Sequence, residues 1–269
     1  MAKGLRELEE MASKLDIIIE VRDARAPSLT SSPVVSKISK IRPVWVVMSK
    51  RDLADEKATS KWTGYLASPV TKVWAFDLLR QKISSLKKQL LTKKPKHREV
   101  RIAVAGIPNV GKSQLLNQLI GKKSAKVGGI PGVTRGISWF RGDGFLVVDS
   151  PGILDPKSGS EVHKCLAWLG CTKSEVTGGY DSLGIGLAGM LKRKGLWYLV
   201  EEKWDLPEID EDDAASLERI GKRLGCLVSG GNVDLNMAGM RFIDNFSTGK
   251  LGRVSLELPG EKNLWDGPS

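Results

Sequence analysis

Short apolar runs alternate with amphipathic stretches along residues 1–170 of the chain. Apolar runs bounded by polar or glycine residues predict buried strands, and apolar side chains three and four residues apart predict helices. Strands are expected over residues 16–21, 44–48, 70–75, 100–105, 137–140 and 145–148. Helices are expected over residues 5–15, 33–41, 55–66, 83–91, 112–120 and 161–169. This alternation is typical of an α/β fold with a mainly parallel sheet and helices on both faces.

The pattern changes after residue 170, where the chain becomes rich in glycine and mainly helical in its periodicity. Helices are expected over residues 183–194, 214–224 and 235–246. A chain of 269 residues is long enough for a complete α/β domain and a smaller second domain. We therefore predict an α/β domain at residues 1–170 and a small all-helical domain at residues 171–269.

The net charge of +11 is unevenly distributed along the chain. Residues 1–159 hold 29 lysines and arginines against 14 aspartates and glutamates, a balance of +15, whereas residues 160–269 hold 13 against 17, a balance of −4. The densest basic stretch is residues 80–101, with Lys87, Lys88, Lys93, Lys94, Lys96 and Arg98. A basic field attracts polyanions and favours a nucleic-acid partner, with a solvated surface as the competing interpretation.

The apolar runs are too short to cross a membrane, and no signal-peptide pattern precedes the first strand. We therefore expect a cytoplasmic protein with no membrane partner, and we also expect a monomer. The cysteines Cys165, Cys171 and Cys226 are odd in number and form no CxxC pair. Reduced, partly buried thiols are thus favoured over a disulfide or a zinc site.

The sequence GIPNVGKS at residues 106–113 matches the phosphate-loop pattern GxxxxGK(S/T) between an expected strand and an expected helix. The two glycines let backbone amides turn toward phosphates. Lys112 can reach the outer phosphates, and Ser113 can place its hydroxyl on Mg²⁺. The candidate phosphate-binding residues are Gly106, Asn109, Val110, Gly111, Lys112 and Ser113. The alternative is a glycine-rich connecting turn.

A second motif, DSPG at residues 149–152, follows another expected strand. Asp149 can hold the magnesium shell, while the amide of Gly152 can sense a terminal phosphate. Thr134, in an earlier glycine- and proline-rich loop, can add a hydroxyl to the metal, although a loop threonine taken alone is more often structural. Mg²⁺ is therefore the expected cofactor, held by Ser113, Thr134 and Asp149.

The tetrapeptide SKRD, from Ser49 to Asp52, is a near-match to the guanine-selecting element of GTPases. Asp52 would accept hydrogen bonds from N1 and N2 of guanine, and Lys50 would pack along the base. Ser49 replaces the usual asparagine and can make fewer bonds, which predicts a weaker guanine preference. A companion loop should touch the base near Ala75. Read alone, SKRD would be a solvated turn, but its position relative to the other motifs favours guanine binding.

SKRD precedes the phosphate loop, whereas the guanine-selecting element of an ordinary GTPase follows it. The order is guanine-selecting element, companion loop, phosphate loop, switch threonine and DxxG turn. With VRDARAP at residues 21–27, this order resembles the circularly permuted GTPases of the ribosome-biogenesis GTPase A (YlqF/YawG) family. Residues 227–257 are similar to that family's C-terminal helical signature, so the resemblance covers nearly the whole chain. It implies a circularly permuted P-loop GTPase domain followed by the helical domain.

The resemblance also implies a function. It implies a GTP-binding and GTP-hydrolysing assembly factor for the large (50S) ribosomal subunit, with ribosomal RNA as a partner and hydrolysis stimulated by the ribosomal particle. The helical domain at residues 171–269 would bind RNA or the ribosome. Asn109 resembles an asparagine that helps to coordinate an activating potassium ion in related enzymes, whereas turn geometry is the other reason for an asparagine there.

No residue is assigned as catalytic, because Ile153 stands where many GTPases have the glutamine that orients the attacking water. Slow intrinsic turnover is therefore expected. Ile153 also leaves open an alternative function, a nucleotide-gated RNA-binding scaffold with little or no hydrolysis. A small-molecule kinase is disfavoured, because SKRD and DSPG would then have no task.

Overall fold

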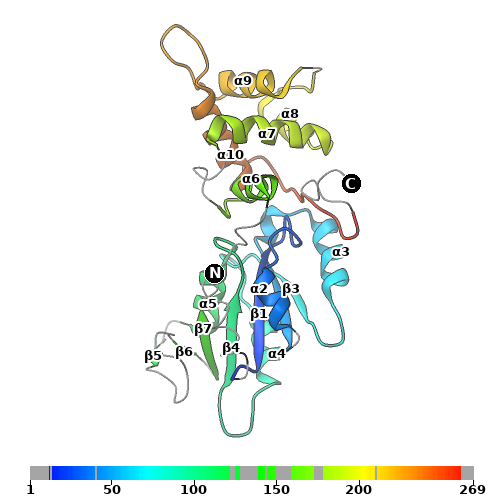
Figure 1. Ribbon diagram of the computed structural model, residues 1–269, viewed down its shortest axis with the longest axis vertical. Coiled ribbons are helices and arrows are strands. Elements are labelled where there is room, and N and C mark those ends of the chain that lie inside the picture. The colour runs from blue at the N-terminus through cyan, green and yellow to red at the C-terminus, as the bar shows by residue number, and fades with distance from the viewer. Residues whose placement is uncertain are drawn as a thin grey trace. The chain divides into compact units, whose positions relative to one another are not determined.

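The computed structural model describes residues 12, 14–39, 41–121, 125–127, 139–142, 144–149, 159–172, 178–209 and 211–261. Contacts between Cα atoms divide the chain into two units. The first consists of Met1–Lys157 and Ser255–Asn263, and the second of Ser158–Val254 and Leu264–Ser269. The first unit holds all the described strands, and the second is helical (Figure 1).

The described strands form one sheet with the order β3-β2-β1-β4-β7-β6-β5. Their bounds are β1 Ile17–Asp23, β2 Val44–Ser49, β3 Val73–Ala75, β4 Val100–Ala105, β5 Ala125–Val127, β6 Trp139–Gly142 and β7 Phe145–Asp149. The strands from β3 to β7 in this order pair in parallel, whereas β6 and β5 are antiparallel at one edge. The predicted α/β class with a mainly parallel sheet is confirmed.

Helices cover both faces of this sheet. The described helices of the first unit are α2 Pro33–Ile38, the 3₁₀ helix η1 Arg51–Leu53, α3 Glu56–Leu66, α4 Ser84–Leu91 and α5 Lys112–Ile120. On one face, Ile18 of β1 packs in a buried cluster with Val35 and Ile38 of α2. Val46 of β2 packs with Trp62 of α3. Val46 is on the same face as Ile18, because Ile18 pairs with Val44 and residues two apart in a strand point to the same face.

The opposite face is covered by α4 and α5. Trp45 points to this face because successive strand residues alternate. The Lys72 ammonium lies 5.5 Å from the Trp45 ring centre and donates to Gln89 of α4. Gln118 of α5 accepts the N–H of Ile83, the residue that precedes α4, at 3.2 Å. Both faces are therefore shielded, as a parallel sheet requires.

Some element boundaries differ from the predicted ones. The strand expected from residue 70 begins at Val73, because Ser68 and Thr71 close a turn in which Ser68 N–H donates to Thr71 O at 3.0 Å. The short edge strand β5 and the helix α8, Tyr198–Trp204, were not predicted. The helix expected over residues 5–15 falls mostly outside the described residues.

The second unit contains α6 Ser160–Trp168, α7 Tyr180–Arg193, α8, α9 Asp213–Arg223 and α10 Leu235–Ser247. Helices α7 and α10 approach closely at two glycines, since a Cβ atom on Gly184 would lie 2.7 Å from the Cα of Gly239. The boundary predicted after residue 170 assigns α6 to the α/β domain, whereas the contacts place α6 in the helical unit. The Trp168 indole N–H donates to Leu183 O at 2.9 Å and fixes α6 on α7.

The cysteines Cys165, Cys171 and Cys226 are free thiols, and all three are buried, more fully than predicted. Burial raises the pKa of the Cys165 thiol to about 12. The protonated form therefore dominates at neutral pH. Among the described helices, none has the length and apolar character needed to cross a membrane.

Candidate nucleotide site

The motif residues expected to bind nucleotide gather at one edge of the sheet. Ser49 ends β2, Ala75 ends β3, Gly106 follows β4, and Asp149 ends β7. These strands are parallel, so their carboxyl ends lie at the same edge (Figure 1). This edge is where parallel α/β sheets bind ligands.

The phosphate loop depends on its two glycines. Gly106 has φ of 149°, and a Cβ atom there would lie 2.5 Å from Val21 O on the neighbouring strand. Gly111 has φ of 101° and is the N-cap of α5. The Lys112 ammonium donates to Ile107 O at 2.8 Å, across the loop. The loop thus places backbone amides and one ammonium at a helix N-terminus, an arrangement suited to phosphates.

Asn109 is exposed in this loop and has φ of 57°. Asparagine tolerates this left-handed conformation better than most residues. The backbone alone is therefore a sufficient reason for asparagine at this position, and its potassium contact stays a prediction.

Asp149 and Ser113 offer the oxygen atoms that Mg²⁺ prefers. Asp149 is exposed at the end of β7, paired in register with Val104 of β4, and Ser113 is exposed in the first turn of α5. Partial desolvation raises the pKa of the Asp149 carboxyl, and the charge of Lys112 offsets part of this shift. One carboxylate and one hydroxyl beside the phosphate loop fit a magnesium ion whose other ligands are water and phosphate oxygens. Thr134, Gly152 and Ile153 lie outside the described residues.

Ser49 connects the guanine-selecting segment to the phosphate loop. Its hydroxyl lies 3.0 Å from Arg22 O and also within hydrogen-bond distance of Val110 O in the phosphate loop. A Cβ atom on Gly111 would lie 3.3 Å from the Ser49 Cβ. The serine therefore gives this contact the short side chain that a close approach of the two segments needs.

Lys50 is held by a buried ion cluster to which the sequence motifs assign no role. Lys50 has φ of 54°, and its ammonium lies 2.9 Å from Asp23 Oδ2. The Arg25 guanidinium donates to both Asp23 oxygens, at 3.0 and 2.8 Å, and both side chains are fully buried. Burial alone would raise the pKa of Asp23, but the charges of Arg25 and Lys50 and the Arg25 hydrogen bonds lower it well below its usual value. The signal in the sequence was VRDARAP at residues 21–27, which begins at the last residue of the predicted strand.

Asp52 is half-buried in η1, the 3₁₀ helix that begins directly after Lys50. The segment that follows β3 lies beside SKRD, since Phe76 O accepts the N–H of Arg51 at 3.2 Å, and the base contact near Ala75 stays a prediction. Asp77, which was not predicted, shapes this loop by accepting the N–H of Leu79 at 3.0 Å. A companion segment thus lies beside the guanine-selecting segment.

A phosphate loop that contacts an upstream guanine-selecting segment, on a sheet with β1, β2 and β3 before the loop, defines a circularly permuted P-loop GTPase. A sequence profile described as "50S ribosome-binding GTPase" matches residues 101–177. "Ribosome biogenesis GTPase A" of Bacillus cereus is 32% identical, over 97% of this chain and 92% of that protein. The chain belongs to the ribosome biogenesis GTPase A family.

Solved structures agree with this assignment. The GNP-bound crystal structure of YlqF from T. maritima has a TM-score of 0.68 and 26% identity, and it covers 97% of this chain and 100% of that one. The GDP-bound structure of the same protein has a TM-score of 0.68 and 27% identity, over 95% of this chain and 100% of that one. The match spans both units of the chain.

Proposed function

We propose that this GTPase is an assembly factor for the large (50S) ribosomal subunit, with hydrolysis stimulated by the ribosomal particle. The observation that supports its nucleotide-binding part is the contact of Ser49 with Val110, which brings SKRD and the phosphate loop together at one sheet edge. The names of the relatives and of the matching profile support the ribosomal partner.

At the phosphate end, Gly106, Asn109, Val110 and Gly111 would present backbone amides, and Lys112 would neutralise the outer phosphates. Ser113 and Asp149 would hold Mg²⁺, which supplies positive charge against the transferred phosphate when it is bound. The Lys112 ammonium donates to Ile107 O across the loop, and an outer phosphate oxygen would compete with that carbonyl for the ammonium. Thr134 and Gly152 would complete the phosphate and metal contacts.

At the base end, Asp52 would accept the N1 and N2 hydrogens of guanine, a donor pair that adenine lacks. Lys50 would pack along the base with its ammonium fixed on Asp23. Ser49 and Ala75 would complete the pocket from the ends of β2 and β3. Selectivity for guanine then depends on a loop that the buried ion cluster holds in place.

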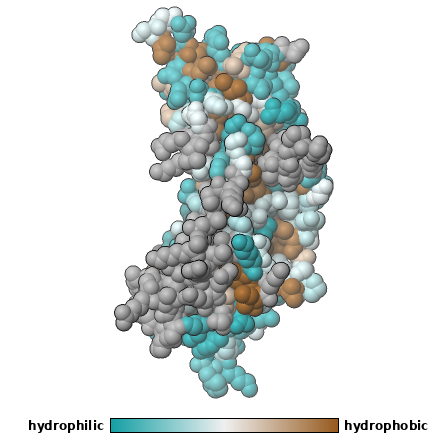
Figure 2. Space-filling view, in the orientation of Figure 1, coloured by the Kyte–Doolittle hydropathy of each residue, from teal (hydrophilic) through white to brown (hydrophobic). Residues whose placement is uncertain are grey.

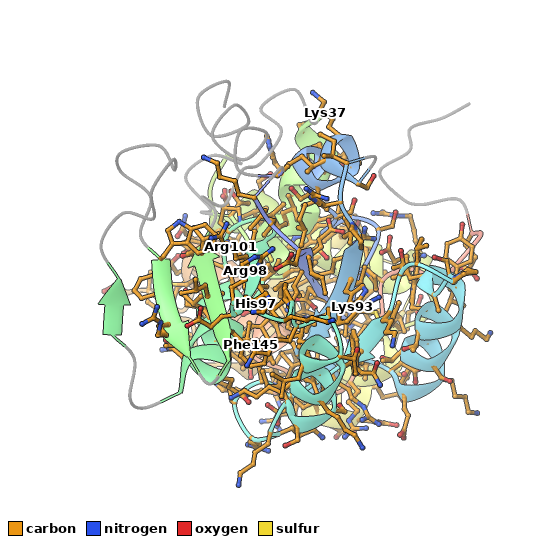
Figure 3. The ribbon with its side chains drawn as sticks, turned by 90° about the horizontal axis from the view of Figure 1, so that it is seen from below. Lys37, Lys93, His97, Arg98, Arg101 and Phe145 are labelled. Carbon is orange, nitrogen blue, oxygen red and sulfur yellow. The ribbon has the colours of Figure 1, made fainter. Side chains whose placement is uncertain are left out.

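We also propose a surface for ribosomal RNA on the first unit, at the opposite end of the sheet from the nucleotide. Residues 92–99 directly precede β4, so they lie at its amino end, and that end of the unit is hydrophilic (Figures 1 and 2). The exposed lysines there are Lys88, Lys93, Lys94 and Lys96. Arg98 lies at the same end of the unit, as Figure 3 shows. Its guanidinium is engaged with Asp16 through two hydrogen bonds, at 2.6 and 2.8 Å. The lysines are therefore the groups available to a polyanion.

The proposed function predicts that purified large subunits accelerate GTP hydrolysis. Intrinsic turnover is expected to be slow, because Ile153 cannot hydrogen-bond to water. Added subunits, immature or mature, are expected to raise the rate by at least about tenfold, and by more in potassium than in sodium if Asn109 holds a potassium ion. Phosphate release under single-turnover conditions measures this.

The same assay distinguishes a stimulated GTPase from a nucleotide-gated scaffold. Small ribosomal subunits serve as the control and should not accelerate hydrolysis. Nucleotide-dependent binding to large subunits without turnover in either salt would support the scaffold instead. Neither binding nor acceleration would rule out the ribosomal proposal while leaving the GTPase assignment intact.

Charge reversal of the basic surface should weaken particle binding. The double variant Lys93→Glu and Lys96→Glu replaces two positive charges by two negative ones and is expected to lower affinity for large subunits about tenfold or more. The slope of log affinity against log salt should also become shallower. The matched control reverses two exposed lysines of α3, Lys57 and Lys61. Equal losses in both double variants would contradict a specific surface.

A further inference from the structure

The last described segment of the chain returns to the first unit and is buried there. Residues 255–257, which we call the strap, follow the helical unit but belong to the α/β unit. Leu256 is 1% exposed and Glu257 is 2% exposed. A buried carboxylate needs partners to offset its desolvation, so the contacts of Glu257 decide what the strap does.

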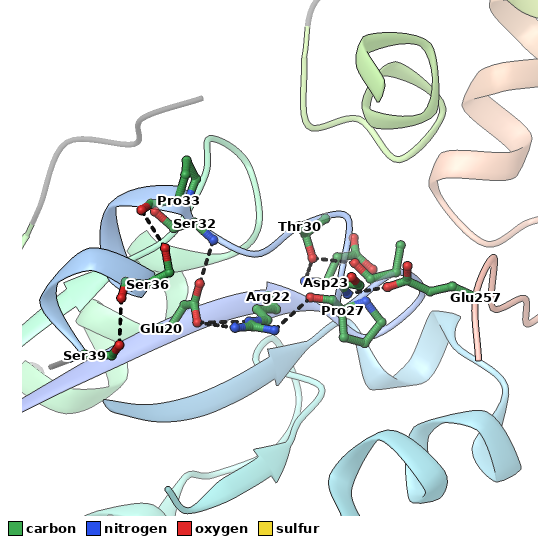
Figure 4. A network of polar contacts seen from close by, with 12 residues as sticks. Glu20, Arg22, Asp23, Pro27, Thr30, Ser32, Pro33, Ser36, Ser39 and Glu257 are labelled. Atoms are coloured by element: carbon green, nitrogen blue, oxygen red, sulfur yellow. Dashed lines mark hydrogen bonds and ion pairs between the residues drawn. The ribbon is translucent and has the colours of Figure 1, made fainter. Parts of the chain in front are cut away.

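Glu257 caps the turn that contains the end of VRDARAP. Thr30 N–H donates to Ala26 O at 3.0 Å, which makes residues 26–30 one helical turn. The first N–H groups of such a turn cannot bond within it. The Glu257 carboxylate accepts the N–H groups of Ser28 and Leu29, the latter at 3.3 Å (Figure 4). A charged acceptor on two turn amides is a strong form of capping.

The strap continues this contact along the loop and reaches the buried ion cluster. Leu256 N–H donates to Arg25 O at 2.8 Å, beside the loop. Arg25 is the residue whose guanidinium holds Asp23, the partner of Lys50. Thr30 closes the same loop, since its hydroxyl accepts Asp23 N–H at 2.9 Å and donates to Ala26 O at 2.7 Å.

The strap also holds the other flank of the guanine-selecting segment. Asp55, which follows η1 and caps α3, donates its N–H to the Ser255 hydroxyl at 3.2 Å. The Trp62 indole N–H donates to Glu257 O at 3.0 Å. SKRD therefore lies between two segments, the loop at residues 24–30 and the start of α3, and the strap bonds to both.

We propose that the strap is a positioning element for guanine recognition, and that Glu257 is a positioning residue that acts on Lys50 through Arg25 and Asp23. This inference rests on the proposed guanine-binding role of SKRD. Without Glu257 the turn amides are uncapped, the loop loses its orientation, and the Asp23–Arg25 pair no longer fixes the Lys50 ammonium. The conformation of the phosphate loop depends instead on Gly106 and Gly111. Loss of Glu257 should therefore weaken recognition of the base and leave phosphate binding nearly unchanged.

The test compares binding of GDP and ADP to the full chain. Glu257→Ala is expected to weaken GDP binding about tenfold, because a charge-assisted bond to two amides is lost. ADP binding should change about twofold or less, so the ratio of the two affinities falls. Glu257→Gln keeps an acceptor oxygen and should restore most of the ratio. Glu261→Ala, an exposed residue of the same segment, is the matched control.

A double-variant cycle with Lys50→Ala tests the route. If Glu257 acts through Lys50, Glu257→Ala should add little to the loss caused by Lys50→Ala. Equal weakening of GDP and ADP, or full additivity with Lys50→Ala, would overturn the proposal. Should Glu257→Ala fail to fold, Ser255→Ala removes the hydroxyl acceptor at Asp55 and should lower the same ratio to a smaller extent. An unaltered ratio in that variant would count against the strap.

Failure of the underlying function gives a different result. Wild-type protein that binds GDP and ADP equally, with no effect of Asp52→Asn, would refute guanine selection itself. A guanine preference that Asp52→Asn removes and Glu257→Ala leaves unchanged would refute only the role of the strap.

Discussion

Asp23→Ala is expected to lower the free energy of unfolding by about 3–5 kcal/mol, because it leaves a buried cation without its carboxylate. The Arg25 side chain has no exposed surface, and Asp23 Oδ2 is 2.8 Å from its guanidinium and 2.9 Å from the Lys50 ammonium. Lys50 is 25% exposed and can regain water, whereas Arg25 cannot. The destabilisation should therefore come mainly from Arg25. Urea unfolding followed by tryptophan fluorescence measures it.

A double variant separates the charge from the packing. Replacing both partners, Asp23→Ala with Arg25→Met, removes the buried cation together with its carboxylate and should be less destabilising than Asp23→Ala alone. Guanine binding should stay weak in the double variant, because Lys50 still lacks its partner. If the double variant is as unstable as the sum of the single ones, the ion cluster does not account for the effect.

The Asp23–Arg25 pair also predicts that part of the free energy of unfolding is lost in acid. The folded-state pKa of Asp23 is lowered well below its usual value, whereas the unfolded carboxyl titrates at about 4. The cluster therefore contributes its full stability above that pH and loses it as the pH falls toward the folded-state pKa. Between about pH 5 and pH 3, the free energy of unfolding of Asp23→Asn should fall less than that of the wild type. Parallel curves would contradict the lowered pKa.

The phosphate loop was the part of the site most predictable from sequence. Its strand and helix begin and end where expected, at residues 100–105 and 112–120, because glycines mark the turn between them. Gly106 and Gly111 have the positive φ angles that a glycine turn between a strand and a helix implies. A pattern of local residues fixes a local structure here, so one sequence is enough to find it.

The buried ion cluster needed the sheet register. Asp23 pairs with Ser49 across β1 and β2, which places it beside Lys50 although the two residues are far apart in the chain. Each lies two residues beyond the end of a predicted strand, so parallel pairing was the missing information. The strap is harder still, because nothing local in residues 255–257 indicates that Glu257 bonds to Ser28.

The periodicity of a helix also does not predict which domain the helix packs in. Helix α6 has the apolar spacing of the helices that cover the sheet, and it was predicted to be one of them. Its Trp168 instead packs on α7 within the helical unit. Amphipathic spacing says that a face is buried but does not identify the partner, which tertiary packing decides.

Gly106→Ala is expected to weaken GTP and GDP binding about a hundredfold, because an added methyl group cannot be placed without moving the phosphate loop. The new Cβ would lie 2.5 Å from Val21 O and 3.2 Å from the Val110 side chain. The first contact is with the backbone of β1, which the parallel pairing on both sides holds in place. The loop must therefore move away from β1, and its amides then leave the positions that phosphates need.

Gly121→Ala is the matched control, because it introduces the same methyl group at a positive φ without a clash. Gly121 has φ of 75°, and no described atom lies within 4 Å of a Cβ placed there. Both variants place an alanine at a positive φ that favours glycine, which costs on the order of 1–3 kcal/mol, so the larger part of their difference reports the collision with β1. Nucleotide titration and thermal unfolding of the two proteins measure it. Equal nucleotide affinities would mean that the loop can move aside, and that its contact with Val21 does not set the phosphate site.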